Sequence, residues 1–387
     1  MKNLYLLLSL FLALSSYGQT KAYLHGEYKP EKGGTVYIAQ HTHVVDNINP
    51  VARPNAKIRN VILMIGDGMG VSHVFAAMTA NNDRLYIDQM PYIGFQKTKA
   101  KNRYRTDSAG AGSALATGKK TDYGSISVDE NNQANPTILE YAAGNGYGTG
   151  LVAACKITHA TPAAFIAHVP VRNQYEDIAA FFVSDSIDLF LGGGSDDFCK
   201  RETGINLRPA LEAKGFQVLT DRSELAAIKS GKIAGLFANG HLEAYPKRGE
   251  FLVESTLKAI EILNQKKNGF FLMVEGSQID WTAHDNDLGA TVEEMLDFDR
   301  AVGAALKFAE KDGHTLVIVT ADHETGGLSV INGDIEHGMV EGKFNTSGHS
   351  SLMVPVFAYG PGAAKFAGIY ENTAIFDKMM ESFGFKK

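Results

Sequence analysis

The fold is indicated most clearly by residues 61–70, which have the sequence VILMIGDGMG. The apolar run that opens this stretch predicts a strand buried on both faces, because a strand with one face in water alternates polar and apolar residues. The glycines that follow let the backbone turn sharply beside Asp67, so that its carboxylate can project into an open site. Taken alone, the segment is equally consistent with a Gly-Asp-Gly turn that has no chemistry.

Similar apolar runs recur along the chain and alternate with helical patterns. The clearest helical pattern covers Thr291–Lys311, where apolar residues fall on one face. This alternation predicts an α/β fold with a mainly parallel central sheet and helices on both faces. No repeat, low-complexity tract or proline-rich linker divides the chain, so we expect one large domain. The further strand candidates are Gly150–Cys155, Leu189–Leu191, Phe270–Val274, Thr315–Thr320 and Val354–Tyr359.

The first residues have the pattern of an export signal. Lys2 precedes the apolar run Leu4–Leu14, and small residues follow up to an expected cleavage point after Gly18. The run is too short to span a bilayer, and no later segment is apolar for long enough, so we expect no membrane span. We expect an exported protein, periplasmic or extracellular. The expected divisions are a signal peptide at 1–18, an irregular arm at 19–58 and the main domain at 59–387.

Composition narrows the class of protein further. Hydrophobic residues make up 44% and charged residues 21% of the chain, which is typical of a soluble globular protein with a large core. The formal net charge is −6, and a mildly acidic protein offers no general positively charged surface for binding nucleic acids. The sequence does not settle whether Cys155 and Cys199 pair, and we expect two separate thiols.

Side chains of the types that bind metals follow several of the predicted strands. Because open α/β sheets place their chemistry beyond the carboxyl ends of strands, we expect these side chains to converge. Asp280 and His284 are four residues apart, which would place both on one face of a helical turn. Mixed imidazole and carboxylate sets suit zinc, and oxygen-only sets suit magnesium. The alternative is chance clustering of Asp67, Glu275, Asp280, His284, Asp322, His323 and His349.

A candidate nucleophile lies within residues 105–114. Ser108 is predicted to begin a helix of small residues, whose free N–H groups can face an anion. A hydroxyl at a helix start is more often only an N-cap. A neighbouring zinc ion would favour the nucleophile, since coordination lowers the pKa of an oxygen nucleophile toward neutrality.

A candidate for holding a phosphoryl group is Arg172. It follows a helix that is predicted to open near residues 158–162. The arginine fork matches two phosphoryl oxygens. Without the metal-binding set, Arg172 would more often be a surface charge.

Six motifs, in this order along the chain, resemble those of the alkaline phosphatases. They are Ile65–Gly70, Thr106–Ala109, His159–Ala164, Val274–Gly276 with Ile279–Asp280, Thr320–His323 and Ser347–His349. The resemblance extends from about residue 59 to 361. It implies hydrolysis of many phosphate monoesters to alcohol and inorganic phosphate at alkaline pH, by a homodimer whose catalytic domain is residues 59–387.

The resemblance also implies two zinc ions and one magnesium ion, each held by three side chains. The first zinc would be held by Asp280, His284 and His349, the second by Asp67, Asp322 and His323, and the magnesium by Asp67, Thr161 and Glu275. Ser108 would be phosphorylated, and hydroxide at a zinc ion would then hydrolyse the phosphoserine. Arg172 would hold the phosphoryl oxygens, with Asp107 expected to orient it.

Two positions differ from the best-known bacterial branch of the family, which has Asp and Lys in place of His159 and Trp281. The first change removes a carboxylate beside the third metal position, so we expect weaker magnesium binding there or binding of zinc. The second removes a water-mediated phosphate contact, so we expect easier release of phosphate.

Two other functions compete with this one. A relative that cleaves phosphodiesters or sulfate esters would share the fold and metals, but Ser108 together with Thr161 and Glu275 favours monoesters. A noncatalytic metal- or phosphate-binding protein of the cell envelope would not need the nucleophile. The histidines without a motif are expected to be structural or exposed: His25, His41, His43, His73, His168, His241, His314 and His337.

Overall fold

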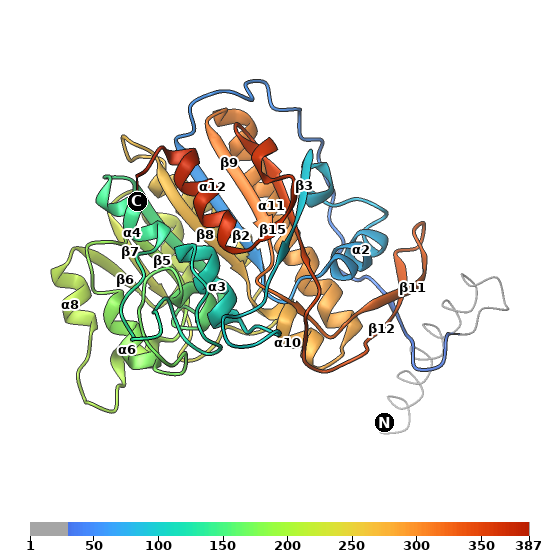
Figure 1. Cartoon of the computed structure of the whole chain (residues 1–387), viewed down its shortest axis with the longest axis horizontal. Coiled ribbons are helices and arrows are strands. Elements are labelled where there is room, and N and C mark those ends of the chain that lie inside the picture. The colour runs from blue at the N-terminus through green and yellow to red at the C-terminus, as the bar shows by residue number, and fades with distance from the viewer. Residues whose placement is uncertain (1–29, 387) are drawn as a thin grey trace, which may run out of the picture.

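The computed structural model describes residues 30–386, so the expected signal peptide, the start of the arm and His25 lie outside the described residues. A ten-stranded sheet occupies the centre of the described chain, in the order β15-β3-β14-β9-β2-β8-β4-β5-β7-β6 (Figure 1). Its strands are β2 (Asn60–Gly66), β3 (Tyr92–Lys97), β4 (Gly148–Lys156), β5 (Leu189–Gly193), β6 (Phe216–Leu219), β7 (Lys232–Leu236), β8 (Phe270–Gly276), β9 (Thr315–Thr320), β14 (Val354–Tyr359) and β15 (Gly368–Glu371).

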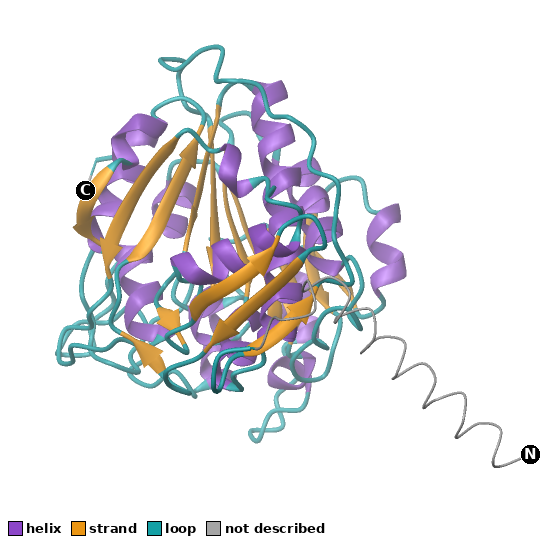
Figure 2. Ribbon diagram, turned by 90° about the vertical axis from the view of Figure 1, so that its right-hand side faces the viewer, coloured by secondary structure: helices purple, strands orange, loops and turns teal. Residues whose placement is uncertain are grey.

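Helices cover both faces of this sheet, which confirms the predicted α/β class (Figure 2). One face packs against α2 (Val71–Ala80), α9 (Phe251–Leu263) and α11 (Leu288–Asp312). The other packs against α3 (Ser108–Thr117), α4 (Ile138–Gly144), α5 (Ala160–Ala163), α6 (Tyr175–Phe181) and α12 (Thr373–Phe383). The remaining helices are α7 (Ser195–Cys199), α8 (Arg208–Ala213), α10 (Gln278–His284) and the 3₁₀ turns Ile87–Gln89, Arg222–Ala227 and Ala363–Phe366.

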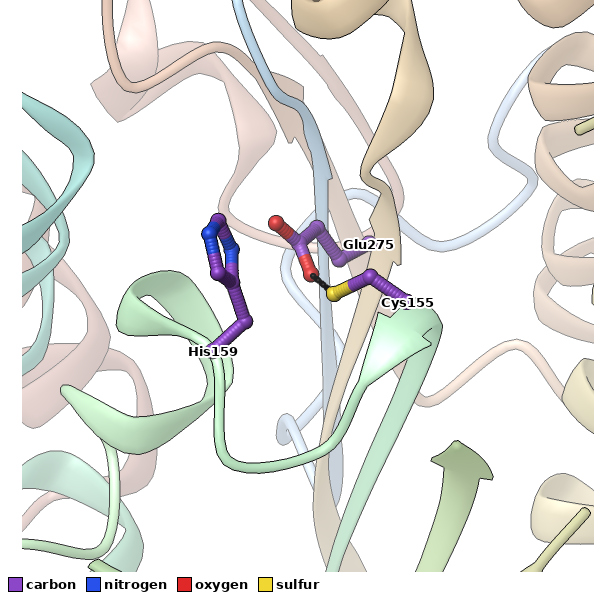
Figure 3. A group of neighbouring side chains, drawn as sticks. All are labelled: Cys155, His159 and Glu275. Carbon is purple, nitrogen blue, oxygen red and sulfur yellow. Dashed lines mark hydrogen bonds between the residues drawn. The ribbon is translucent and has the colours of Figure 1, made fainter. Parts of the chain in front are cut away.

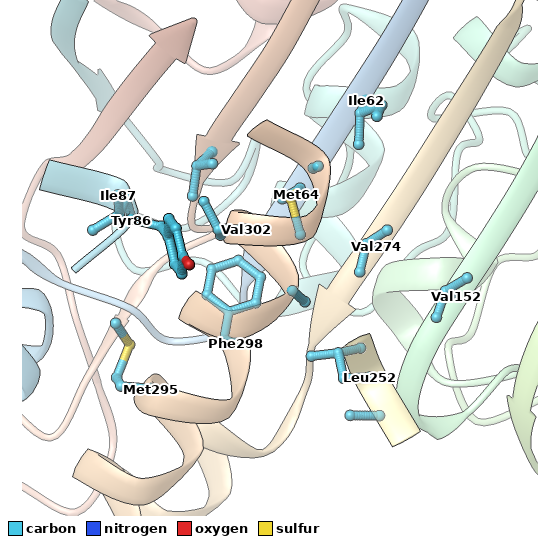
Figure 4. Close-up of a cluster of buried hydrophobic side chains, with 14 of the residues drawn as sticks. Ile62, Met64, Tyr86, Ile87, Val152, Leu252, Val274, Met295, Phe298 and Val302 are labelled. Carbon is cyan, nitrogen blue, oxygen red and sulfur yellow. The ribbon is translucent and has the colours of Figure 1, made fainter. Parts of the chain in front are cut away.

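The central strand β2 explains why its sequence is apolar without alternation. Ile62 and Met64 belong to the core on the side of α11, together with Phe298 and Val302 of that helix (Figure 4). Val61 and Leu63 belong to the core on the opposite face. Burial on both faces therefore removes the polar alternation that a half-exposed strand shows.

Strand β14 runs antiparallel to both of its neighbours, β3 and β9. The other pairs of the large sheet are parallel, so the sheet is mainly parallel, as predicted. The reversal has a consequence for the site, because the amino end of β14 lies at the carboxyl end of β9. Residues just before β14 therefore reach the same edge of the sheet as residues just after β9.

Several short strands were not predicted from sequence. In the arm, β1 (Thr35–Ile38) pairs with β12 (Met339–Lys343), which also pairs with β11 (Ser329–Asp334). A two-stranded ribbon joins β10 (Glu324–Thr325) to β13 (His349–Ser350). Cys155 and Cys199 are both free thiols, as expected. None of the helices within residues 30–386 combines the length and apolar character needed to cross a bilayer.

Helix α3 lies close against α5 because its residues are small. Its N-cap is Asp107, whose side chain accepts a hydrogen bond from the Gly110 N–H at 3.1 Å, so Ser108 is the first helical residue rather than the cap. A Cβ added at Gly112 would lie 3.1 Å from the Ala164 Cβ and 3.6 Å from the Thr161 Cα. The glycine thus allows the approach that brings Thr161 toward the start of α3.

Replacement of Gly112 by leucine should destabilise the protein by about 1–3 kcal/mol, because the new side chain has no space between α3 and α5. The measurement is the free energy of unfolding in urea. Gly144→Leu is the matched control, since a Cβ at Gly144 meets no atom within 4 Å and its effect should stay within about 0.5 kcal/mol. Equal stability of the Gly112 variant and the wild type would contradict the tight packing.

Candidate active site

Three parallel strands end at the same level and deliver acidic residues to one edge of the sheet. Ile65 in β2 pairs with Glu275 in β8 on one side and with Thr320 in β9 on the other. Asp67 follows β2, and Asp322 follows β9. The register of β2 with its two neighbours therefore brings these carboxylates together, as the sequence predicted.

A first group of metal-binding side chains forms where α10 meets β13. The Nε2 atom of His284 lies 3.4 Å from the Oδ1 atom of Asp280, and the Nε2 atom of His349 lies 3.5 Å from the same oxygen. The two Nε2 atoms are 3.1 Å apart. His349 arrives here because β13 pairs with β10 and leads into the antiparallel strand β14. These are the three side chains expected for the first zinc ion.

A second group lies beside the first and contains the candidate nucleophile. The Nε2 atom of His323 lies 3.5 Å from Asp67 Oδ1 and 3.2 Å from Asp322 Oδ2, and all three residues are fully buried. The Ser108 hydroxyl oxygen lies 3.3 Å from the same Nε2 atom. The rings of His323 and His349 stack with centroids 3.6 Å apart, which makes the two groups neighbours.

Several buried oxygens in this region have no hydrogen-bond partner within residues 30–386. They are both carboxylate oxygens of Asp67, Oδ2 of Asp322, Oε1 of Glu275 and Oγ1 of Thr161. An unpaired buried oxygen costs about 1–3 kcal/mol, so a native structure rarely keeps several together without a ligand. A cluster of unpaired oxygens beside imidazoles fits divalent cations. Two sets of side chains here have ligand atoms that all lie within 4.8 Å of one another: the second group, and a set in which His323 joins Asp280 and His349.

The electrostatics also indicate cations. Burial, together with the charges of Asp322 and Asp280, raises the pKa of Asp67 well above its ordinary value. Burial raises the pKa of both Asp322 and Glu275 to about 7. Carboxyls in such surroundings retain protons near neutral pH unless positive charge is present, and bound cations would keep them ionised.

The histidines of the two groups differ in environment. The hydrogen bond to Asp280 raises the pKa of His284 to about 9. Burial lowers the pKa of His323 well below its ordinary value, which keeps that ring neutral and its nitrogen lone pair available. Neutral imidazole is the form that binds metals.

Asp107 connects the helix that begins at Ser108, the candidate nucleophile, to Arg172, the candidate phosphoryl-binding residue. Its Oδ2 atom accepts a hydrogen bond from Arg172 Nη1 at 2.9 Å. Its Oδ1 atom accepts a hydrogen bond from the Gly110 N–H, and this bond caps the start of α3. Burial opposes the charge of Arg172, but Asp107 outweighs this effect and raises the pKa of the guanidinium group. One carboxylate thus contacts both the start of α3 and the guanidinium group of Arg172.

The two positions that depart from the family pattern lie next to each other. The rings of His159 and Trp281 are in edge-to-face contact with centroids 5.7 Å apart. The Nε2 atom of His159 lies 3.4 Å from Arg172 Nη2. Burial, together with the charge of Arg172, lowers the pKa of His159 to about 3, so this ring is neutral.

Sequence analysis missed His241, which the structure places against the site. Its ring lies 4.6 Å from that of Trp281 and 5.5 Å from that of His159, centroid to centroid. His241 belongs to no motif, but it follows β7, a parallel strand, and that position was the available signal. The other described histidines without a motif have polar partners elsewhere: His41, His43, His73, His168, His314 and His337.

Comparison with known proteins gives a consistent result. Residues 58–343 match the family described as alkaline phosphatase. Alkaline phosphatase 4 of Bacillus subtilis (strain 168) is 37% identical, over 82% of this chain and 87% of that protein. The structure of alkaline phosphatase from the Antarctic bacterium TAB5 is 38% identical with a TM-score of 0.82, and covers 86% of this chain and 100% of that one.

A variant of the TAB5 enzyme adds information about a metal. In that variant a histidine is replaced by aspartate, and Mg is bound in the M3 site. The structure is 39% identical to this chain with a TM-score of 0.81, and covers 86% of this chain and 99% of that one.

Removal of metals should destabilise the protein, and the loss should grow as pH rises from about 6.5 to 9. Without cations, Asp322, Glu275 and His284 keep protons in the folded state that the unfolded chain releases at lower pH. The stability that such groups contribute is complete below their unfolded-state pKa and is lost as pH rises through the folded-state pKa. The measurement is Tm of chelator-treated and zinc-loaded protein across this range.

The pH range is chosen to exclude an opposing effect. Buried neutral histidines such as His323 and His159 cost stability only below about pH 6.5, where the unfolded chain binds protons and they do not. A difference in Tm that is constant from pH 6.5 to 9 would contradict the proposed role of cations in this cluster.

Proposed function

Because this chain belongs to the alkaline phosphatase family, we propose that it hydrolyses its substrates through a covalent phosphoserine at Ser108. The chain is a metal-dependent phosphomonoesterase. The observation that carries the proposal is the position of the Ser108 hydroxyl, 3.3 Å from His323 Nε2 and at the first residue of α3. The nucleophile therefore adjoins both a metal-binding group and the free N–H groups of a helix start.

The first zinc ion would be held by Asp280, His284 and His349, and the second by Asp67, Asp322 and His323. The unpaired oxygens of Asp67 and Asp322 support this assignment. Cations held there would lower the pKa of the Ser108 hydroxyl and neutralise charge that develops on the attacking and leaving oxygens.

A third cation position would involve Asp67, Thr161 and Glu275. The family resemblance implies magnesium there, but an oxygen-only set is not what surrounds it, since His159 lies at its edge. We propose that His159 corresponds to the histidine that is replaced in the TAB5 variant with Mg bound in the M3 site. On this assignment, a histidine disfavours magnesium at the third position.

The side chains of this protein perform the following steps. Arg172, held by Asp107, binds two oxygens of the phosphoryl group and presents phosphorus to Ser108. The Ser108 hydroxyl gives its proton to solvent and its oxygen forms a bond to phosphorus, as the bond to the leaving alcohol oxygen breaks. The leaving oxygen takes a proton from water. A second water molecule then attacks phosphorus and gives up a proton, the bond between phosphorus and Oγ breaks, Oγ takes up a proton, and inorganic phosphate leaves.

The contacts proposed for this site predict that the enzyme accepts phosphate monoesters with many different alcohol groups. Arg172 and Ser108 would contact only the phosphoryl group, so a broad range of monoesters at alkaline pH is the natural proposal. Trp281, in place of lysine, adds no charge to hold the product and supports easier phosphate release. Export as a periplasmic or extracellular homodimer is also proposed, on the pattern of residues 1–18 and on the family resemblance.

Ser108→Ala should lower kcat by at least about 10³-fold, because the variant cannot form the covalent intermediate. The measurement pairs turnover of a nitrophenyl monoester with acid quenching and mass spectrometry of the peptide that contains residue 108. Ser125→Ala is the control, since the Ser125 hydroxyl donates to the Pro170 carbonyl oxygen outside the metal groups. Retained turnover in the Ser108 variant would overturn the phosphoserine mechanism.

Arg172→Ala should lower kcat/KM by about 10- to 100-fold, because hydrogen bonds to a charged partner contribute about 1.5–3 kcal/mol. Steady-state kinetics measure this loss, and added guanidinium should restore part of the activity if the lost group bound the phosphoryl oxygens. Arg208→Ala, which removes an exposed ion pair with Glu212, should leave kinetics unchanged. A loss that guanidinium cannot restore and that matches a fall in stability would assign Arg172 a structural role instead.

A further inference from the structure

Cys155 lies against the third cation position, although no motif includes it. It is the penultimate residue of β4 and is fully buried. Its Sγ atom lies 3.6 Å from Glu275 Oε2 (Figure 3). The thiol therefore contacts one of the carboxylates that would hold the third cation, and it does so from a rigid strand.

The ligand atoms of Cys155, His159 and Glu275 all lie within 4.8 Å of one another. Cys155 lies one residue before the end of β4 and His159 is the N-cap residue of α5, so the short connection between the two elements brings both side chains to the same space. Figure 3 shows the thiol and the imidazole ring on either side of the carboxylate. A sulfur, a nitrogen and an oxygen atom, each able to bind a metal ion, thus lie around one position.

The cluster contains atoms that lack partners within residues 30–386. His159 Nδ1 and Glu275 Oε1 are both buried and make no hydrogen bond. The other imidazole nitrogen of His159 faces Arg172 Nη2, so Nδ1 is the atom that remains for a ligand. Thr161 Oγ1 is a further unpaired atom, on the first turn of α5. Buried unpaired donors and acceptors at one place indicate a ligand.

We propose that the third cation of this protein is zinc, bound by Cys155, His159 and Glu275, in place of magnesium bound by oxygens alone. Thiolate and imidazole are ligands that select zinc, whereas magnesium requires near-octahedral oxygen and usually retains several waters. The inference rests on the proposed three-cation centre and changes the identity and the ligands of one member.

The alternative is that Cys155 is an inert core residue, since free cysteines are commonly buried among apolar groups. Cys155 does border the apolar core on this face of the sheet, and its Sγ atom lies 3.2 Å from the Lys156 carbonyl oxygen. Its sulfur also faces the Glu275 carboxylate, however, and the imidazole of His159 with its unpaired nitrogen belongs to the same group, which an inert core cysteine would not require. Cys199 provides the comparison within the same chain: it is partly exposed and belongs to none of the groups of potential metal ligands among the described residues.

The experiment measures metal content and a spectrum rather than activity. Full-length protein, Cys155→Ala and Cys199→Ala are loaded with zinc in excess magnesium, desalted and analysed for metals. Cys155→Ala should retain one zinc fewer per chain than the wild type, and Cys199→Ala should match the wild type. The cobalt-loaded wild type and Cys199→Ala should show a thiolate-to-cobalt charge-transfer band in the near ultraviolet, and Cys155→Ala should lack it.

The wild-type spectrum decides the question even if Cys155→Ala fails to fold. A cobalt-loaded wild type without the charge-transfer band overturns the proposal, and so does a band that persists in a folded Cys155→Ala variant. The proposal is also overturned if folded Cys155→Ala retains as much zinc per chain as the wild type. Failure of the proposed function is distinguishable, because it would appear as absence of phosphoserine at Ser108 while the cobalt spectrum remained as expected.

Discussion

The structure depends on holding four carboxylates together in a space closed to water. Asp67, Glu275, Asp280 and Asp322 are all almost fully buried at one edge of the sheet. Their mutual repulsion and lost hydration would destabilise this edge unless positive charge compensates. The paired strands β2, β8 and β9 supply a frame rigid enough to impose the arrangement, so the energy of the core pays for a site that the carboxylates alone would not form.

Ser108 and Arg172 are attached to this frame through small residues and one shared carboxylate. Gly112 allows α3 to approach α5, and Asp107 at the start of α3 binds both the helix and Arg172. A displacement of α3 would therefore move the Ser108 hydroxyl and the guanidinium group together. This coupling preserves the geometry between them, which matters because phosphoryl transfer depends chiefly on positioning and charge.

The sequence predicted the parts of this arrangement that rest on uninterrupted apolar runs. Strands β2, β4, β8 and β9 are buried on both faces and were recognised, whereas β3 is partly exposed and was not. Strand direction was beyond reach, since a buried run looks the same in a parallel and an antiparallel strand. His349 could be identified by its motif, but the reason it meets Asp280 is the reversed direction of β14.

In the site proposed at the end of β4 and the start of α5, selectivity for a metal changes without a change of fold. Glu275 is fixed by the sheet, so the character of the proposed third position depends on the side chains that β4 and α5 bring to it. Cys155 was placed by sequence in an apolar strand, and the pattern of that strand gives no sign that its end faces a carboxylate. In the proposed site, sulfur and nitrogen donors at two positions four residues apart add softer ligands to the oxygens of Glu275, and metal preference follows the donor atoms more closely than the backbone that carries them.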